Sequence, residues 1–313
     1  MPDFDAYLMV DWSAKNERAA GADSIWYSLV TRKSGDLVVE SLENPATRSL
    51  AAAEIKGVLR DLVKRDQTVL VGFDFPYGYP TGFAKSLGLD DAPRWLAIWR
   101  EIASRIVDRH DNRNNRFVVA ADFNRRISGG PCPFWGCPTG CAGPTLSCTK
   151  HGTGGLPEKR ITDVGAMQPI WKLFGAGAVG SQALCGIPYL LALRTDPVLE
   201  PVSRVWPFET GLGALPSRAH RDWLVLHAEI YPSLLPSTPL PNEVKDAVQV
   251  RTLARHFAQL DDGGRLAELF EGDSSLTAAE KERVEREESW TLGVGGKNQM
   301  QRRLDLTPPW SPS

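Results

Sequence analysis

Residues 6–11 read Ala-Tyr-Leu-Met-Val-Asp and residues 68–74 read Thr-Val-Leu-Val-Gly-Phe-Asp, so two apolar runs each end in an acid. Short apolar runs of this kind are typical of strands that are buried on both faces of a sheet. Ligand sites of open α/β sheets lie at the carboxyl ends of parallel strands, so acids from different strands can meet there. The two stretches therefore predict an α/β fold with Asp11 and Asp74 at one edge of its sheet.

The remaining elements of such a fold follow from the spacing of apolar residues. The stretches on either side of Lys33-Ser34-Gly35-Asp36 predict a β-hairpin, because that turn separates two strand-like runs. Thr47 and Ser49 stand at the start of a run with helical spacing, and either is a candidate N-cap. The expected strands are residues 24–31, 37–42 and 222–230, and the expected helices are residues 49–64 and 243–260.

Residues 77–218 lack this regular alternation and predict a mostly helical insertion. Helical spacing occurs at residues 93–109 and 170–184, and a loop rich in Gly, Pro and Cys occupies residues 128–157. The predicted organisation is a discontinuous core of residues 1–76 and 219–262, the insertion, and a helical extension over residues 263–313. In that extension, Thr277-Ala-Ala-Glu280 matches a capping box.

The composition of the chain limits its function classes. The 313 residues carry a formal net charge of −2, which excludes a polycation that binds nucleic acid through bulk charge alone. No apolar run approaches the roughly 18–20 residues of a membrane helix, and the N-terminus does not resemble a signal peptide. We therefore expect a cytoplasmic protein without a membrane partner.

Two further acids could join Asp11 and Asp74. Glu229 lies in the predicted strand 222–230, and Asp246 lies in the first turn of the helix that follows. Converging carboxylates repel one another unless a cation compensates, and Mg²⁺ or Mn²⁺ prefers such oxygen ligands. Two ions roughly 4 Å apart would suit phosphodiester hydrolysis. The alternative is that each acid only caps a helix or closes a turn.

The order of elements resembles the ribonuclease H fold, and several short motifs resemble a family of uncharacterised bacterial proteins described as predicted nucleases of that fold. These motifs are Val10-Asp11-Trp12-Ser13, Phe73-Asp74-Phe75-Pro76, Phe134-Trp135-Gly136-Cys137, Val179-Gly180-Ser181-Gln182, Glu229-Ile230-Tyr231-Pro232 and Lys245-Asp246-Ala247.

The resemblance implies a ribonuclease H-like mixed sheet and a carboxylate site. It implies that Asp11, Asp74 and Asp246 are the metal ligands, with Glu229 a fourth ligand or a structural partner of Tyr231. We therefore predict a divalent-metal-dependent nuclease. The alternative is a protein of the same fold that acts on, or binds, a small phosphorylated metabolite.

Basic residues gather in the insertion. Arg105, Arg109 and Arg113 recur every four residues, and Arg116 follows them. On one helical face they would form a strip that contacts phosphates, although neighbouring acids could instead neutralise the strip. The candidate substrate-binding residues are Arg109, Arg113, Arg125, Arg126, Ser181 and Gln182.

Two other patterns have competing interpretations. Residues 175–180 match G-x-G-x-x-G, but no convincing strand precedes them, so a dinucleotide-dependent oxidoreductase is less favoured than a Gly-rich turn that opens a helix. The cysteine loop lacks the C-x2-C pairs of structural zinc sites, so reduced thiols are favoured over zinc. Its cysteines are Cys132, Cys137, Cys141 and Cys148.

Overall fold

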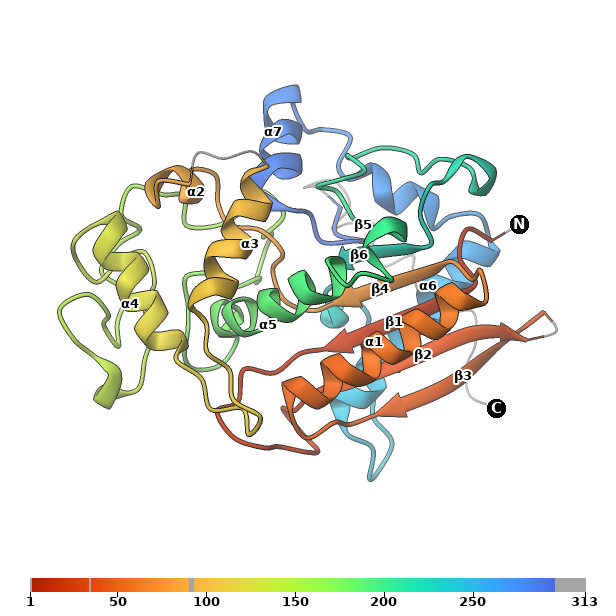
Figure 1. The fold of residues 1–313 in the computed structure, drawn as a ribbon, viewed down its shortest axis with the longest axis horizontal. Coiled ribbons are helices and arrows are strands. Elements are labelled where there is room, and N and C mark those ends of the chain that lie inside the picture. Colours follow the sequence, from red (N-terminus) through yellow and green to blue (C-terminus); the bar gives the residue numbers. More distant parts are fainter. Residues whose placement is uncertain (1, 34, 90–92, 296–313) are drawn as a thin grey trace.

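A mixed sheet of six strands lies at the centre of the protein. The computed structural model describes residues 2–33, 35–89 and 93–295, and Figure 1 shows the course of the chain. The strand order is β3-β2-β1-β4-β6-β5, with β1, β2 and β3 antiparallel and β4, β6 and β5 parallel to β1. The strands are β1 (Ala6–Asp11), β2 (Trp26–Lys33), β3 (Asp36–Glu43), β4 (Val69–Phe73), β5 (Ser203–Val205) and β6 (Val225–Glu229). The predicted α/β class is therefore confirmed.

Seven α-helices accompany this sheet in the described part of the chain. They are α1 (Arg48–Lys64), α2 (Phe83–Ser86), α3 (Arg94–Arg105), α4 (Arg116–Ile127), α5 (Val179–Arg194), α6 (Lys245–Asp262) and α7 (Ala278–Arg283). Of the two candidate N-caps of α1, Thr47 is confirmed and Ser49 is wrong, because the Thr47 side chain accepts a hydrogen bond from the Leu50 amide at 3.3 Å and Ser49 lies inside the helix. No described helix has the length and apolar character needed to cross a membrane.

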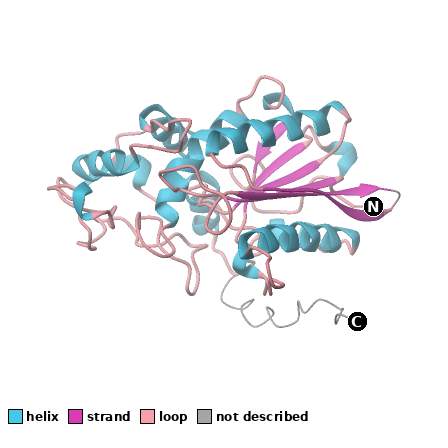
Figure 2. Cartoon of the chain, turned by 90° about the horizontal axis from the view of Figure 1, so that it is seen from below, coloured by secondary structure: helices cyan, strands magenta, loops and turns pink. Residues whose placement is uncertain are grey.

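The sheet is buried on both faces, as Figure 2 shows with helices above and below the strands. Alternate residues of β1 point to opposite faces. Leu8 and Val10 belong to the core that includes α1 and α5, whereas Tyr7 and Met9 belong to the core that includes α6. The same alternation directs Asp11, two residues after Met9, toward the α6 side.

The insertion contains elements that the sequence patterns did not predict. β5 lies within residues 77–218 and forms the edge of the sheet beside β6, so this segment contributes to the central layer. Helix α4 was also missed. The predicted start of a helix at residue 170 is wrong, because Gly175 and Gly177 adopt positive φ angles of 87° and 70° and α5 begins only at Val179.

The C-terminal part returns to the sheet. The predicted capping box at Thr277 and Glu280 opens α7, and a π-helical turn, Val284–Glu288, follows it. The backbone amide of Leu292 then donates to the Glu229 carbonyl at 2.8 Å, beside the end of β6. Residues 296–313 of the predicted extension lie outside the described residues.

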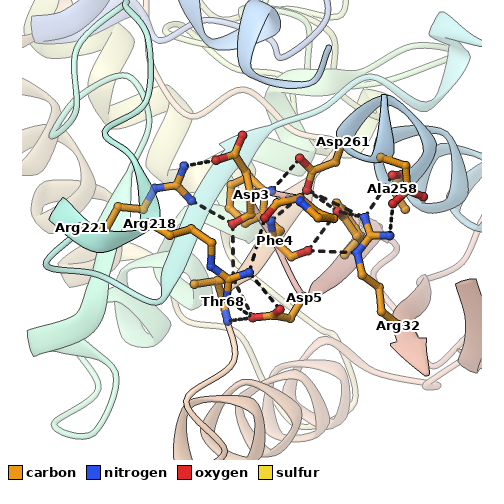
Figure 3. A network of polar contacts seen from close by, with 12 residues as sticks. Asp3, Phe4, Asp5, Arg32, Thr68, Arg218, Arg221, Ala258 and Asp261 are labelled. Atoms are coloured by element: carbon orange, nitrogen blue, oxygen red, sulfur yellow. Dashed lines mark hydrogen bonds and ion pairs between the residues drawn. The ribbon is translucent and has the colours of Figure 1, made fainter. Parts of the chain in front are cut away.

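A polar network closes the amino ends of β1 and β4 (Figure 3). Asp261, in the last turn of α6, accepts hydrogen bonds from the amides of Asp3 at 2.8 Å and Phe4 at 2.9 Å. Asp5 accepts one from the Thr68 amide at 2.8 Å, which joins the residues that precede β1 and β4. Because protein groups fill this end, the carboxyl ends of the strands are the ones that remain open to a ligand.

Candidate active site

Asp11 and Asp74 lie side by side at the carboxyl ends of two neighbouring strands. The parallel register pairs Val10 of β1 with Phe73 of β4, and the residue that follows each of them is an acid. The Asp74 amide donates to the Val10 carbonyl at 3.2 Å, and a hydrogen bond joins the two carboxyl groups. Asp74 also accepts a hydrogen bond from the Trp12 amide at 2.7 Å. The predicted convergence of these two acids is therefore present.

Both carboxyl groups of the pair have raised pKa values. Burial raises the pKa of Asp11 well above its ordinary value, and the negative charge of Asp74 raises it further. Burial also raises the pKa of Asp74 to about 6, while hydrogen bonds from the Trp12 amide and from Asp11 act in the opposite direction. Burial and mutual repulsion therefore both favour the protonated form of Asp11.

Asp246 and Asp23 add negative charge to this pair. Asp246, in the first turn of α6, raises the pKa of both Asp11 and Asp74 through its charge. Its carboxylate also accepts a hydrogen bond from the Asp23 amide at 2.7 Å. Asp23 precedes β2 in a turn with φ 54°, and its charge acts on Asp11. The sequence did not indicate Asp23, because it ends no strand and matches no motif.

The arrangement of these acids fits an open site for a cation such as Mg²⁺ better than a site in which protein side chains enclose the metal. In the described part of the chain, no three Asp, Glu, His or Cys side chains are grouped so that they could enclose an ion. Mg²⁺, however, is usually held through one or two carboxylates and keeps several of its waters. Asp11 and Asp74 could supply such a pair of oxygen ligands, and a cation there would offset the repulsion between their charges. Asp246 would add charge nearby.

The acids border a cleft of about 900 Å³. Asp11, Asp23 and Asp246 line it together with residues of the insertion, among them Arg116 and Ser181. Asp74 lies deeper and lines an adjoining cavity of about 110 Å³. The cleft thus connects the acidic pair with a basic residue from α4.

Ser181 and Gln182, both predicted to bind substrate, lie at this cleft in the first turn of α5. Gln182 donates to the Trp12 carbonyl at 2.6 Å and approaches Asp74 at 3.4 Å. Ser181 accepts a hydrogen bond from Arg116 Nε at 2.9 Å. This turn of α5 therefore links the acidic pair with the guanidinium of Arg116.

Glu229 forms a buried ion pair instead of facing the cleft. Both of its carboxylate oxygens lie 2.7 Å from the guanidinium of Arg160, which also pairs with Asp163 at 2.8 Å. Further hydrogen bonds reach Glu229 from the Tyr77 amide at 2.8 Å and the Thr291 hydroxyl at 2.6 Å. Its oxygens are thus committed to protein groups, which is typical of a structural residue. Arg160 was not singled out from the sequence.

The predicted arginine strip does not form. Helix α3 ends at Arg105, so Arg109 and Arg113 lie in the following loop and share no helical face with it. Arg113 pairs with Asp111 at 2.7 Å. Arg125 pairs with Asp122, and Arg126 pairs with Glu101. None of Arg109, Arg113, Arg125 and Arg126 lines the large cleft, whereas Arg116 does.

The glycine-rich turn lacks the surroundings of a dinucleotide site. No strand of the described sheet leads into it, since Lys172 forms only an isolated bridge with Trp135. The amide of Val179 donates to the Gly177 carbonyl at 2.9 Å, and that of Gly180 donates to the Lys172 carbonyl at 3.0 Å. These two amides are therefore not free to bind a phosphate.

The cysteine loop borders the same cleft. A hydrogen bond joins the side chains of Cys137 and Cys148, and burial raises the pKa of the Cys137 thiol to about 11. Cys141 is exposed and lines the cleft. Cys132 is half-buried and is followed by a cis proline. Reduced thiols stay the prediction for this loop, with a zinc ion as the less favoured alternative.

The site therefore combines an acidic pair, two further carboxylates and the basic residues Lys15 and Arg116 around the large cleft and the small cavity beside it. Comparisons of the chain with protein-family models, with curated proteins and with solved structures found no match.

Proposed function

We propose that the chain is a divalent-metal-dependent phosphodiesterase of the nuclease type, with Asp11 and Asp74 as the ligands of Mg²⁺ or Mn²⁺. The observation that carries the proposal is the hydrogen-bonded pair of carboxyl groups at the neighbouring ends of β1 and β4. The antiparallel β1, β2 and β3, followed by α1 and the parallel β4, support a ribonuclease H-like core.

The protein groups around the pair would prepare it for catalysis. The Trp12 amide and Gln182 hold Asp74 in place, so that its carboxylate has little freedom to turn away. Asp246 keeps the local potential negative, which attracts a cation. When bound, the cation would neutralise these charges and supply Lewis-acid stabilisation of a phosphoryl oxygen.

A second candidate is the hydrolysis of a small phosphorylated metabolite at the same site. The positions of Arg109, Arg113, Arg125 and Arg126 favour it, because none of them lines the cleft, where the basic side chains among the described residues are Lys15 and Arg116. A short substrate would need only the contacts within the cleft. Both candidates use the same carboxylates, so a substrate panel distinguishes them.

We expect the purified chain to cleave phosphodiesters when Mg²⁺ or Mn²⁺ is present and to lose this activity in EDTA. The panel contains single- and double-stranded DNA and RNA, together with the small diester bis(p-nitrophenyl) phosphate. Cleavage of the polymers supports the nuclease, whereas cleavage of the small diester alone supports the second candidate. No metal-dependent cleavage of any member would overturn the proposal.

Magnesium binding is expected to become tighter as the pH rises through the neutral range. Because the pKa values of Asp11 and Asp74 are raised, protons compete with the cation for these carboxyl groups, so a lower pH opposes binding. Isothermal titration calorimetry in buffers of different ionisation enthalpy counts the released protons, and about one proton per Mg²⁺ is expected. An affinity for Mg²⁺ that is independent of pH would contradict the raised pKa values of Asp11 and Asp74.

A further inference from the structure

Arg116 stands apart from the other buried arginines because it has no acidic partner. Arg48 pairs with Asp108 at 2.6 Å, and Arg160 pairs with Glu229 at 2.7 Å. Arg116 is only 7% exposed, yet no carboxylate of the described residues forms an ion pair with it. A buried charge is costly unless an opposite charge compensates. The guanidinium therefore has a positive charge available to an anion in the cleft.

Neighbouring groups hold Arg116 in one orientation. Its Nε donates to Ser181 Oγ at 2.9 Å, and its Nη1 donates to Asn114 Oδ1 at 2.9 Å. The guanidinium also lies 4.4 Å from the centre of the Phe117 ring. Within the described ranges, no group accepts a hydrogen bond from Nη2. This nitrogen is thus positioned by its neighbours and is left for a ligand.

An exposed apolar surface lies in the same cleft. Phe174 is 52% exposed and Val118 is 69% exposed, and both line the cleft with Arg116. Phe174 directly follows Leu173, whose carbonyl accepts a hydrogen bond from the Ser181 hydroxyl at 2.5 Å. Because that hydroxyl also binds Arg116, the aromatic ring and the guanidinium belong to one connected part of the site. Flat apolar rings in such positions stack on the bases of nucleotides.

We propose that this part of the cleft is a mononucleotide subsite, in which Arg116 binds a phosphate and Phe174 packs against the base. Arginine suits this role because its planar donors match phosphate oxygens. The volume of about 900 Å³ lies within the usual range of small-molecule sites. Identifying the bound phosphate with the reacting group rests on the proposed function, since Gln182 beside Ser181 also contacts Asp74.

The test measures binding to the metal-free protein by calorimetry. The ligands are adenosine 5′-monophosphate and ribose 5-phosphate, which differ by the base. Arg116→Met is expected to weaken both ligands by at least about tenfold, because it removes a charged hydrogen bond to the phosphate. Phe174→Ala is expected to weaken the nucleotide by about tenfold and to leave ribose 5-phosphate unchanged.

Matched controls lie outside the cleft. Arg113→Met removes an arginine that pairs with Asp111, and Leu240→Ala removes an apolar side chain that is 68% exposed. Both controls should bind like the wild type. Arg116→Lys keeps the charge without the planar donors, and it replaces Arg116→Met if that variant melts well below the wild type. Its affinity for both ligands should fall.

Three results would overturn the subsite: no binding of either ligand by the wild type, equal effects of the Arg116 and Arg113 variants, or equal effects of Phe174→Ala on the two ligands. Binding is measured without metal or turnover, so this outcome is separate from hydrolysis. A chain that binds the nucleotide through Arg116 but cleaves no phosphodiester retains the subsite and loses the proposed function.

Discussion

Replacing Arg160 by methionine is expected to lower the free energy of unfolding by about 3–5 kcal/mol, since it removes one partner of a buried ion pair. Arg160 is 3% exposed and lies between the carboxylates of Asp163 and Glu229. Burial alone would lower the pKa of Arg160, but these two charges raise it. Without the guanidinium, two buried acids would face each other with no positive charge between them.

Urea unfolding measures this loss, with Arg113→Met as the control. Arg113 forms its ion pair on the surface, so its replacement should change stability by less than about 0.5 kcal/mol. A loss below about 1 kcal/mol for Arg160→Met would contradict the structural role of the pair. Glu229→Gln separates the two roles considered for Glu229, because a metal ligand would lose activity without a comparable loss of stability.

Asp11→Asn is expected to reduce metal-dependent cleavage by at least about a hundredfold and to make the metal-free protein more stable than the wild type at pH 8. The loss of cleavage activity is expected because an amide would replace a charged ligand of the cation. The gain follows because the asparagine amide can still donate to Asp74 but cannot add a second negative charge beside it.

The sign of the pH dependence follows from the raised pKa values of Asp11 and Asp74. Below the pKa of these acids in the unfolded chain, about 3.9, both states are protonated and the pair does not lower stability. As the pH rises toward the folded pKa, the folded state holds protons that the unfolded state has released, so wild-type stability declines. The advantage of Asp11→Asn should therefore be near zero at pH 4 and largest at pH 8.

Thermal unfolding and cleavage assays on the same preparations check this prediction. Asp61→Asn, a matched change on the surface of α1, should leave both measurements unchanged. Added Mg²⁺ should raise the melting temperature of the wild type and have little effect on Asp11→Asn. An active Asp11→Asn variant, or one that is less stable than the wild type at pH 8 without metal, would contradict the site.

The parts of the fold that could be predicted are those with strong local patterns. β1 and β4 are buried on both faces and therefore read as apolar runs, and Thr47 has the hydroxyl that caps α1. β5 has only three residues, which are too few to show the alternation of apolar and polar residues that identifies a strand. The start of α5 depends on positive φ angles in a glycine-rich turn, which the apolar spacing of the preceding residues concealed.

The candidate site divides in the same way. Asp11, Asp74 and Asp246 could be proposed because each follows or opens a regular element, so topology alone brings them to one end of the sheet. The partners of Glu229 and Arg116 depend on contacts between distant segments, such as the pair formed by Arg160 and Glu229, which are 69 residues apart. Local sequence carries no sign of such contacts.

Helix α6 connects the acidic cluster with the polar network at the amino ends of β1 and β4. Asp246 lies in its first turn and Asp261 in its last, where the amides of Asp3 and Phe4 hold it. At about 1.5 Å per residue, the 18 residues of α6 span about 27 Å. The helix therefore reaches from the acidic cluster to the polar network, which holds its C-terminal end. Hydrogen bonds to the N-terminal residues thus hold one end of the helix whose other end carries Asp246.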